Sequence, residues 1–563
     1  MRPISKRALQ LFLHKHPSST YIRALSSNSS NDKQRISYER IFGKTALLGV
    51  AATGLLGYCY WVIKREYGIQ VYAEKQERCR KYPEFGKYKA SLPTYSLKEI
   101  RKHDSKETRI WVTFREGVYD ITDYIKKHPG GEKILISAIG GQLEPLWTMY
   151  PFHEHRAILQ TLEMHRIGNL ALEDQIDDPF KFFDDPYIND PVMHSDNHVV
   201  VEKPYIGSGP LSRLGDEFYT PNEHFYVRNH LPVPQIDPNT HTIELEIEGT
   251  DNKKCYTLDD LKRMKNVTVT AALMCSGNRR EEMVKAVPGA REMVANLTPN
   301  FISNAQWTGV PLSCLLKDMG ITTDEKKYKH VQFIGLDKEV TGEPYSASIP
   351  IFKATDPYGD VILAYEMNGA PLPPMHGFPI RAFVPGHTGA RSVKWLKKVL
   401  VSEHEAPCHY QQIDYKLYGP NVNWKNVDYS ACPALQMVPV NSAVCRPNNG
   451  DTVHVEDGCI NIKGYAYSGG GQKIIRLDVT SDGGETWHTA TLDHQDKSEA
   501  PHHWAWTLWS CKIPVKKDAS EVDVWCKAVD SSGNVQPESF KNIFSWKGCP
   551  CNAYNRVKVK LSH

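Results

Sequence analysis

Hydrophobic and polar positions follow regular periods through the middle of the chain, from about residue 204 to 405. Residues 242–248 alternate between apolar and polar side chains and residues 267–273 are rich in Val and Thr, which predicts strands. Residues 258–264 have the apolar spacing of a short helix. The region contains neither a Gly-x-Gly-x-x-Gly loop nor a P-loop, so the pattern predicts a mixed α+β domain that does not bind nucleotides.

The last part of the chain, residues 406–563, has the pattern of an all-β domain. Residues 474–480 and 522–529 alternate between apolar and polar side chains, and a turn sequence with two glycines, residues 481–487, follows the first run. Such runs separated by turns predict antiparallel strands with one face in a core. An immunoglobulin-like β-sandwich fits this pattern.

A smaller α+β domain is predicted for residues 90–170, where residues 110–114 and 117–121 form two short strands joined by a turn. Residues 171–203 follow it and are acidic and rich in proline, without the period of a helix or a strand. We predict a flexible linker there, so that the small domain is tethered to the rest of the chain.

The N-terminal residues have the composition of a targeting segment. Residues 1–44 are rich in Arg, Lys and Ser, and their first acidic residue is at position 32, as in a mitochondrial transit peptide. Residues 45–63 form an apolar run, just long enough to cross a bilayer and closed by a Lys-Arg pair. A retained membrane anchor and a cleaved sorting signal for the intermembrane space both fit. We favour cleavage after Ile63 and exclude residues 1–70 from the predicted fold.

Composition and charge describe a globular protein of several domains. A chain of 563 residues with 40% hydrophobic and 24% charged residues is neither a membrane bundle nor a disordered polymer. Up to residue 65 the chain holds 11 of the 68 basic and 2 of the 65 acidic residues, which leaves 57 basic and 63 acidic residues and a formal charge of −6. An acidic surface keeps a protein soluble and also steers a basic protein partner.

Cys275 is the strongest candidate for chemistry. It follows the β-like run 267–273 and opens a Gly-Asn turn that continues into Arg279 and Arg280, and such strand ends often carry catalytic groups. Two neighbouring arginines are expected to lower the pKa of the thiol and favour the thiolate, which attacks substrates and ligates soft metals. A single cysteine at a strand end is also often only a small buried apolar residue.

Several stretches around this cysteine resemble one enzyme family. Residues 275–280 (Cys-Ser-Gly-Asn-Arg-Arg) resemble the Cys-Ala-Gly-Asn-Arg-Arg signature of the sulfite oxidases and assimilatory nitrate reductases. Residues 226–234, 345–350 and 363–369 resemble further stretches of the same family. The resemblance covers about residues 90–563 and implies an enzyme with molybdenum bound to a pyranopterin, the molybdopterin cofactor.

The resemblance also implies roles for individual residues. Cys275 would ligate the molybdenum, and Arg228, Arg280 and Tyr345 would hold the oxyanion substrate, a kind of electrostatic stabilisation that is usually the largest catalytic term. The residues that match or lie in pterin-binding stretches are Tyr226, Val227, Arg228, Asn229, His230, Asp337, His376, Arg381, Ser392, Val393 and Lys394. The basic and imidazole groups among them suit an anionic, phosphate-bearing pterin.

Residues 120–131 resemble the cytochromes b5 in their Asp-Ile-Thr and His-Pro-Gly-Gly motifs. That family holds a haem b between two axial histidines, so His128 is the implied first ligand of the iron. The candidates for the second are His153, His155 and His165. We favour His153, which lies 25 residues after the first ligand and follows a Leu-Trp-Thr-Met-Tyr stretch similar to the family's Phe-Trp-Ala-Leu-Tyr, with His155 as the runner-up. Two imidazoles would fill both axial positions and leave the haem to transfer electrons.

The order of the domains distinguishes between members of the family. Because the haem domain comes first, the chain resembles animal sulfite oxidases, which implies oxidation of sulfite to sulfate and transfer of single electrons through the haem to cytochrome c. A homodimer through the C-terminal domain is implied as well. Two alternatives stay open: reduction of nitrate or an S-oxide at the same kind of site, and a haem electron carrier whose pterin domain is inactive.

Three departures from the family pattern fall around the expected anion pocket. Ser276 replaces the usual Ala beside the metal ligand, residues 289–307 lack the family's Gly-Leu-x-Trp, and Lys547 stands where relatives have Arg. We include Lys547 among the candidate catalytic residues, although a lysine offers a point charge where an arginine offers a planar fork. These departures leave the expected chemistry intact and bear on the affinity for sulfite.

Overall fold

The computed structural model describes residues 82–175, 185–287, 297–423 and 426–563. The predicted targeting segment 1–70, with its apolar run 45–63, lies outside the described residues. So do residues 176–184 of the predicted linker and residues 288–296 of the divergent stretch. Within the described part of the chain, no helix combines the length and the hydrophobicity that a membrane crossing requires.

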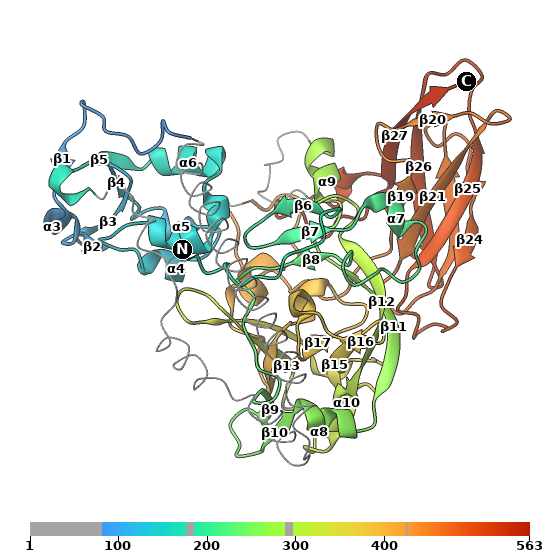
Figure 1. Ribbon diagram of the computed structural model, residues 1–563, viewed down its shortest axis with the longest axis horizontal. Coiled ribbons are helices and arrows are strands. Elements are labelled where there is room, and N and C mark those ends of the chain that lie inside the picture. Colours follow the sequence, from blue (N-terminus) through green and yellow to red (C-terminus); the bar gives the residue numbers. More distant parts are fainter. Residues whose placement is uncertain (1–81, 176–184, 288–296, 424–425) are drawn as a thin grey trace, which may run out of the picture. The chain divides into compact units, whose positions relative to one another are not determined.

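Residues 82–175 form a small α+β unit whose sheet has the strand order β1-β5-β4-β3-β2 (Figure 1). Its strands are β1 (Thr94–Tyr95), β2 (Asp104–Ser105), β3 (Arg109–Phe114), β4 (Gly117–Asp120) and β5 (Arg166–Leu170). Its helices are α3 (Leu97–Ile100), α4 (Glu132–Ile136), α5 (Glu144–Met149) and α6 (Arg156–Glu163). The two predicted strands are β3 and β4, and Phe114 of β3 packs on Trp147 of α5 with ring centroids 4.4 Å apart. This contact ties the sheet to the helix that precedes His153.

The middle of the chain is built on two larger sheets. One has the order β10-β9-β18-β13-β14, and in the other β11-β12-β15-β16 is extended by β17, which pairs with β15. The strands of the first are β9 (Thr242–Ile247), β10 (Lys253–Thr257), β13 (His330–Lys338), β14 (Pro344–Pro350) and β18 (Leu396–Ser402). Those of the second are β11 (Val267–Met274), β12 (Ile302–Pro311), β15 (Ile362–Met367), β16 (Ala370–Pro371) and β17 (Arg381–Phe383). The strands predicted at 242–248 and 267–273 are thus confirmed as β9 and β11.

Short helices connect and cover these strands: α7 (Leu211–Leu214), α8 (Leu258–Arg263), α9 (Arg280–Ala286), α10 (Leu312–Lys317) and α11 (Ile351–Thr355). The predicted helix is α8. It begins where the Thr257 side chain accepts from the Asp260 backbone N–H and the Asp260 carboxylate accepts from the Thr257 N–H, a reciprocal cap that satisfies otherwise unpaired donors.

The irregular linker predicted for residues 171–203 is interrupted by a strand, β6 (His198–Val201). It pairs antiparallel with β7 (Ile206–Ser208), which in turn pairs with β8 (Val227–Arg228). The prediction missed this strand because its proline-rich, acidic surroundings hid a run of three valines, whose β-branched side chains favour extended backbone. The small sheet carries Arg228 to the wall of the site.

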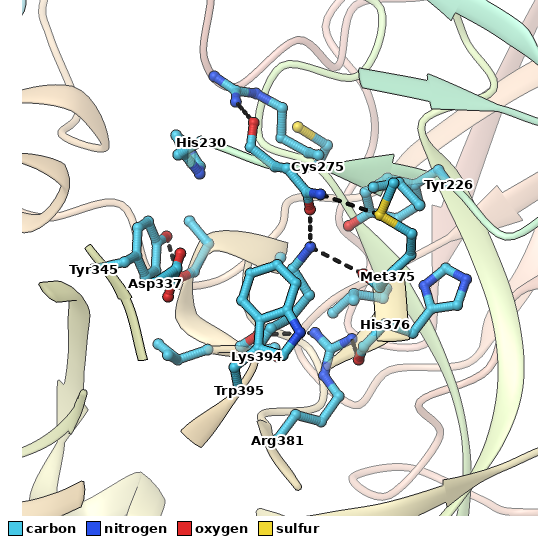
Figure 2. A pocket seen from close by; sticks show the side chains of 18 of the residues that line it. Tyr226, His230, Cys275, Asp337, Tyr345, Met375, His376, Arg381, Lys394 and Trp395 are labelled. Atoms are coloured by element: carbon cyan, nitrogen blue, oxygen red, sulfur yellow. Dashed lines mark hydrogen bonds between the residues drawn. The ribbon is translucent and has the colours of Figure 1, made fainter. Parts of the chain in front are cut away.

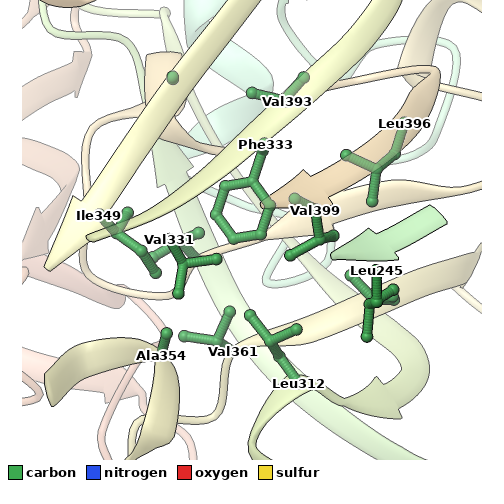
Figure 3. Packing of buried hydrophobic residues seen from close by; sticks show 14 of the residues in the cluster. Leu245, Leu312, Val331, Phe333, Ile349, Ala354, Val361, Val393, Leu396 and Val399 are labelled. Atoms are coloured by element: carbon green, nitrogen blue, oxygen red, sulfur yellow. The ribbon is translucent and has the colours of Figure 1, made fainter. Parts of the chain in front are cut away.

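The largest core packs on the first of the two larger sheets. Figure 3 shows Val331 and Phe333 of β13 beside Val399 of β18, with Leu312 of α10 in the same cluster. These side chains are fully buried, and burial of one such side chain contributes about 1.5–3 kcal/mol. The cluster fixes the strands whose ends carry the candidate site residues.

Residues 441–562 contain two sheets that share a core, as predicted for a β-sandwich (Figure 1). One has the order β19-β21-β25-β24 and the other β20-β27-β26-β22-β23. The strands are β19 (Asn441–Arg446), β20 (Thr452–His454), β21 (Cys459–Tyr467), β22 (Ile474–Thr480), β23 (His488–Thr489), β24 (Thr491–His494), β25 (Thr507–Pro514), β26 (Glu521–Asp530) and β27 (Asn555–Ser562). Along β27 the buried positions Val557, Val559 and Leu561 alternate with exposed ones, the period expected of a strand with one face in a core.

Candidate functional site

A cavity with about 660 Å³ of empty space, part of it open to solvent, is lined by most of the residues that the sequence singled out (Figure 2). Cys275, Tyr345 and all of the predicted pterin-binding residues line it. Arg280 and Lys547, the other two candidate catalytic residues, are not part of its lining.

Cys275 follows β11 directly. Its backbone N–H donates to the carbonyl oxygen of Phe301 at 2.9 Å, which continues the antiparallel pairing of β11 with β12 by one residue. The chain then turns, and the N–H of Asn278 donates back to the Cys275 carbonyl at 3.0 Å. The cysteine is only 6% exposed. The strand pairing and the turn together fix its side chain at the wall of the cavity.

The pKa of the Cys275 thiol differs from the prediction. Burial raises it, and the Gly277 N–H and the guanidinium groups of Arg228 and Arg280 lower it by a smaller amount. The expectation of a depressed pKa from the neighbouring arginines was therefore wrong for the protein alone, because removal of water disfavours the thiolate more than these groups favour it. A bound cation that takes the thiolate as a ligand would reverse this balance.

The side chains of Arg279 and Arg280 make contacts with different parts of the structure. Arg279 adopts left-handed backbone (φ +68°) and is fully buried, and its guanidinium donates to both carboxylate oxygens of Glu282 at 2.9 and 2.7 Å and to the Asn441 side chain at 2.9 Å. Arg280 instead donates to the Gly548 carbonyl at 3.4 Å and to the Cys549 sulfur at 3.2 Å. Arg279 thus links the turn to strand β19, and of the two arginines only Arg280 remains a candidate for binding the anionic substrate.

A Glu282→Gln variant tests the structural role of this pair. Because Arg279 has no exposed surface, removal of its charge partner should lower the free energy of unfolding by about 3–5 kcal/mol. The matched control is Glu281→Gln, whose exposed pair with Lys285 should contribute less than about 1 kcal/mol. Urea unfolding of both variants measures the difference, and equal losses would contradict this assignment.

The cavity wall carries more positive than negative charge. The buried Arg381 guanidinium donates to the carbonyl oxygens of His376 and Ser392, at 2.9 and 2.8 Å, rather than to a carboxylate. Burial lowers the pKa of Arg381 to about 10 and also lowers that of Lys394. Buried cations without an anionic partner are costly. With Arg228 on the same wall, this set of donors fits a ligand that carries several negative charges, as a phosphorylated pterin does.

Asp337 supplies the complementary group on this wall. Its Oδ1 atom is buried and has no hydrogen-bond partner among the described residues, and burial raises the pKa of its carboxyl group although Lys394 lowers it. A buried acceptor without a donor is unfavourable unless a ligand supplies one. The N–H groups of a pterin ring are donors of this kind, so the residues present fit the cofactor that the resemblance implies.

Three ring side chains, those of His230, Tyr345 and Tyr415, meet in the wall of the cavity. His230 Nε2 shares a hydrogen bond with the Tyr415 hydroxyl at 2.7 Å, and its ring centroid lies 5.0 Å from that of Tyr345. Burial lowers the pKa of His230 and raises that of Tyr345, so at neutral pH the imidazole is uncharged and the phenol keeps its proton. The Tyr345 hydroxyl donates to the Ala390 carbonyl at 2.9 Å.

Lys547 forms an ion pair. Its ammonium nitrogen lies 2.8 Å from Asp414 Oδ1, and its side chain is 8% exposed. Burial alone would raise the pKa of Asp414, but the charges of Lys547 and His409 hold it well below its usual range. The next residue, Gly548, has φ +65°, and a Cβ there would lie 2.6 Å from Arg280 Cγ. The C-terminal segment therefore brings Lys547 close to Arg280 with its charge already balanced.

The histidines of residues 82–175 form a second candidate site. The rings of His128 and His153 are 6.0 Å apart and inclined by 23°, a separation that suits two imidazoles on opposite sides of one metal with bonds of about 2 Å. Their Nδ1 atoms contact the carbonyl oxygens of Gly131 and Tyr150, each at 3.0 Å. Such contacts orient a ligand imidazole and leave Nε2 for the metal.

His155 is not part of this ring pair. It is the N-cap of α6, and its Nδ1 accepts from the Ala157 N–H at 3.4 Å. The geometry of the ring pair therefore favours His153 over His155 as the partner of His128.

The residues of the cavity wall that were not predicted from the sequence include Met375, Trp395 and Tyr415. Trp395 directly follows the predicted Lys394 and could have been included on that ground. Tyr415 follows a short π-helix, Tyr410–Asp414, a local feature that has no sequence signal but often occurs at functional sites.

Three family models match the chain. The cytochrome b5-like heme/steroid binding domain matches residues 96–171, the oxidoreductase molybdopterin binding domain residues 230–410, and the Mo-co oxidoreductase dimerisation domain residues 433–562.

Proteins with similar sequences and structures agree with these matches. The mitochondrial sulfite oxidase of Drosophila melanogaster is 46% identical over 479 residues, which cover 84% of this chain and 81% of that protein. The mitochondrial sulfite oxidase of Homo sapiens is 40% identical over 549 residues, which cover 97% of this chain and 96% of that protein. The sulfane dehydrogenase SoxCD of Paracoccus pantotrophus has a similar structure, with a TM-score of 0.53, 25% identity, and coverage of 66% of this chain and 87% of that one.

Proposed function

Because the chain belongs to the sulfite oxidase family, we propose that it oxidises sulfite to sulfate at a molybdenum-pterin centre and passes the electrons singly through a haem b. The observation that carries the proposal is the combination in one cavity of a buried cysteine, an excess of cationic over anionic side chains and an Asp337 carboxylate oxygen without a hydrogen-bond partner among the described residues. A soft-metal ligand beside a polyanion site is what this cofactor needs.

When bound, the molybdenum centre supplies an oxygen atom to sulfite and takes up two electrons. Cys275 contributes a thiolate ligand. Arg228 lowers the energy of an anion beside that ligand, and Arg280 adds a second positive charge from the turn. Tyr345 keeps its proton at neutral pH and donates a hydrogen bond to the Ala390 carbonyl, while the Tyr415 hydroxyl and the uncharged His230 hold each other in place.

The haem b would be held between His128 and His153, whose Nδ1 contacts to backbone carbonyls fix the ring planes. With these two imidazole ligands, the haem would supply one-electron transfer and would offer no site for a substrate. Cytochrome c is the proposed acceptor, because residues from 66 onward carry a formal charge of −6 and attract a basic partner.

We place the protein in the mitochondrion, and within it in the intermembrane space, on the basis of the basic segment 1–44 and the apolar run 45–63. We also propose a homodimer. The match of residues 433–562 to a dimerisation domain supports it.

Purified protein that contains molybdenum and haem tests the proposed activity. Sulfite should reduce cytochrome c, with two molecules of cytochrome c reduced for each sulfate formed. Nitrate supplied with a reductant should give no comparable turnover. Metal-loaded protein that reduces nitrate would contradict the proposal and favour the reductase. Metal-loaded protein that responds to neither anion would contradict it and favour the haem electron carrier with an inactive pterin domain.

A Lys547→Arg variant tests the C-terminal contribution to the anion site. The arginine can keep the pair with Asp414 and still offer a second N–H to the substrate. One added charge-assisted hydrogen bond should lower the KM for sulfite by up to about tenfold with little change in kcat. Lys547→Met is the matched control, which should raise KM. Kinetics unchanged in both variants would remove Lys547 from the site.

A further inference from the structure

Ser276 is the residue after the proposed metal ligand, and it lines the same cavity. It is 5% exposed, and its hydroxyl oxygen is buried without a hydrogen-bond partner among the described residues. The family signature that residues 275–280 resemble has Ala at this place, and this chain has Ser. A buried hydroxyl without a partner destabilises the folded state, and each such group needs an explanation.

The polar groups of the turn are already engaged with other partners. The Asn278 amide donates to the Tyr465 hydroxyl at 3.0 Å, and its Oδ1 accepts from the Phe301 N–H at 3.1 Å. The Arg280 guanidinium bonds to the Gly548 carbonyl and the Cys549 sulfur. None of these groups bonds to the Ser276 hydroxyl, and a ligand in the cavity that Ser276 lines can supply the partner.

We propose that the Ser276 hydroxyl donates a hydrogen bond to a sulfur or oxygen atom that is bound to the molybdenum at Cys275. The inference rests on the proposed function for the identity of the metal. A hydrogen bond to a metal ligand withdraws electron density from it and favours the reduced metal, in the way that such bonds tune other metal centres. Ser276 is therefore a positioning residue that sets the reduction potential.

The test is a Ser276→Ala variant of the protein loaded with both cofactors. The midpoint potential of the molybdenum should fall, and its electron paramagnetic resonance spectrum should lose a coupling to an exchangeable proton. The kcat for sulfite should fall by about tenfold or less, with KM unchanged. Ser276→Thr keeps the hydroxyl and should retain most of the wild-type potential.

Ser208→Ala is the matched control. Ser208 also has a buried hydroxyl without a partner among the described residues, but it does not line the cavity. Its variant should keep the wild-type potential and spectrum. Loss of molybdenum and pterin from Ser276→Ala but not from Ser208→Ala would also support a contact with the cofactor.

Two results would overturn the inference. An unchanged potential and proton coupling in Ser276→Ala would mean that the hydroxyl bonds only to water. An increased KM with an unchanged potential would mean that the Ser276 hydroxyl bonds to the substrate and not to a ligand of the metal. The potential and the spectrum are measured with a chemical reductant, so they test Ser276 even if sulfite proves not to be the substrate.

Discussion

Replacement of Cys275 by serine is expected to abolish sulfite oxidation while the haem spectrum stays as in the wild type. An uncharged hydroxyl is a much poorer ligand for molybdenum than a thiolate. The haem ligands lie within residues 82–175, which have a sheet and a core cluster that do not contain Cys275. Steady-state kinetics with cytochrome c, metal analysis and the visible absorption spectrum of one preparation measure the outcome.

Cys445→Ser is the control for the loss of a buried thiol. Cys445 is fully buried on β19, away from the cavity, so its replacement should change stability and leave the kcat of the folded protein intact. If Cys275→Ser kept more than about a tenth of the wild-type kcat, a barrier change below ~1.4 kcal/mol, the cysteine would be only a structural residue.

The second large effect is expected at the haem. Replacement of His128 or His153 by alanine should remove the low-spin haem spectrum and stop cytochrome c reduction, because each variant loses one of the two axial ligands. Sulfite oxidation with a small inorganic oxidant that takes electrons at the molybdenum should continue. This separation of the two activities would show that electrons pass through the haem on the way to cytochrome c.

His155→Ala is the control for this pair. Its imidazole accepts a hydrogen bond at the start of α6, so its loss should weaken the helix by about 1 kcal/mol and keep the haem spectrum. A spectrum lost in His155→Ala and kept in His153→Ala would reverse the assignment of the second ligand.

Local sequence patterns predicted much of the fold and the cavity. Alternation along residues 242–248 and a Val- and Thr-rich run before Cys275 correspond to β9 and β11, because period and β-branching act within one strand. The predicted pterin-binding residues line one cavity although they are spread from Tyr226 to Lys394. Their grouping came from the family resemblance, since spacing alone does not bring distant strands together.

Features that depend on distant contacts could not be read from the sequence. The thiol of Cys275 was expected to be acidic because arginines follow it, but its pKa is set by burial that the whole fold produces. The sequence gives no reason to assign different roles to Arg279 and Arg280. In the structure, Arg279 has left-handed backbone, and its side chain bonds to Glu282 and to the C-terminal sandwich.

The ion pair of Lys547 could not be predicted from the sequence either. Its partner Asp414 is 133 residues away in the chain, and no local pattern marks the pair. The sequence showed a lysine in place of an arginine, and the structure adds that its charge is already balanced. The expected gain from Lys547→Arg therefore depends on the second N–H of the guanidinium and not on an added charge.

Rapid mixing of sulfite with the oxidised protein, without oxygen or cytochrome c, tests the central claim most directly. We expect the haem absorption to change to the reduced form in a sulfite-dependent reaction, and Cys275→Ser, with its haem intact, to show no change. Haem reduction by sulfite at the wild-type rate in Cys275→Ser would contradict it, as would a molybdenum-loaded wild-type protein whose haem stays oxidised.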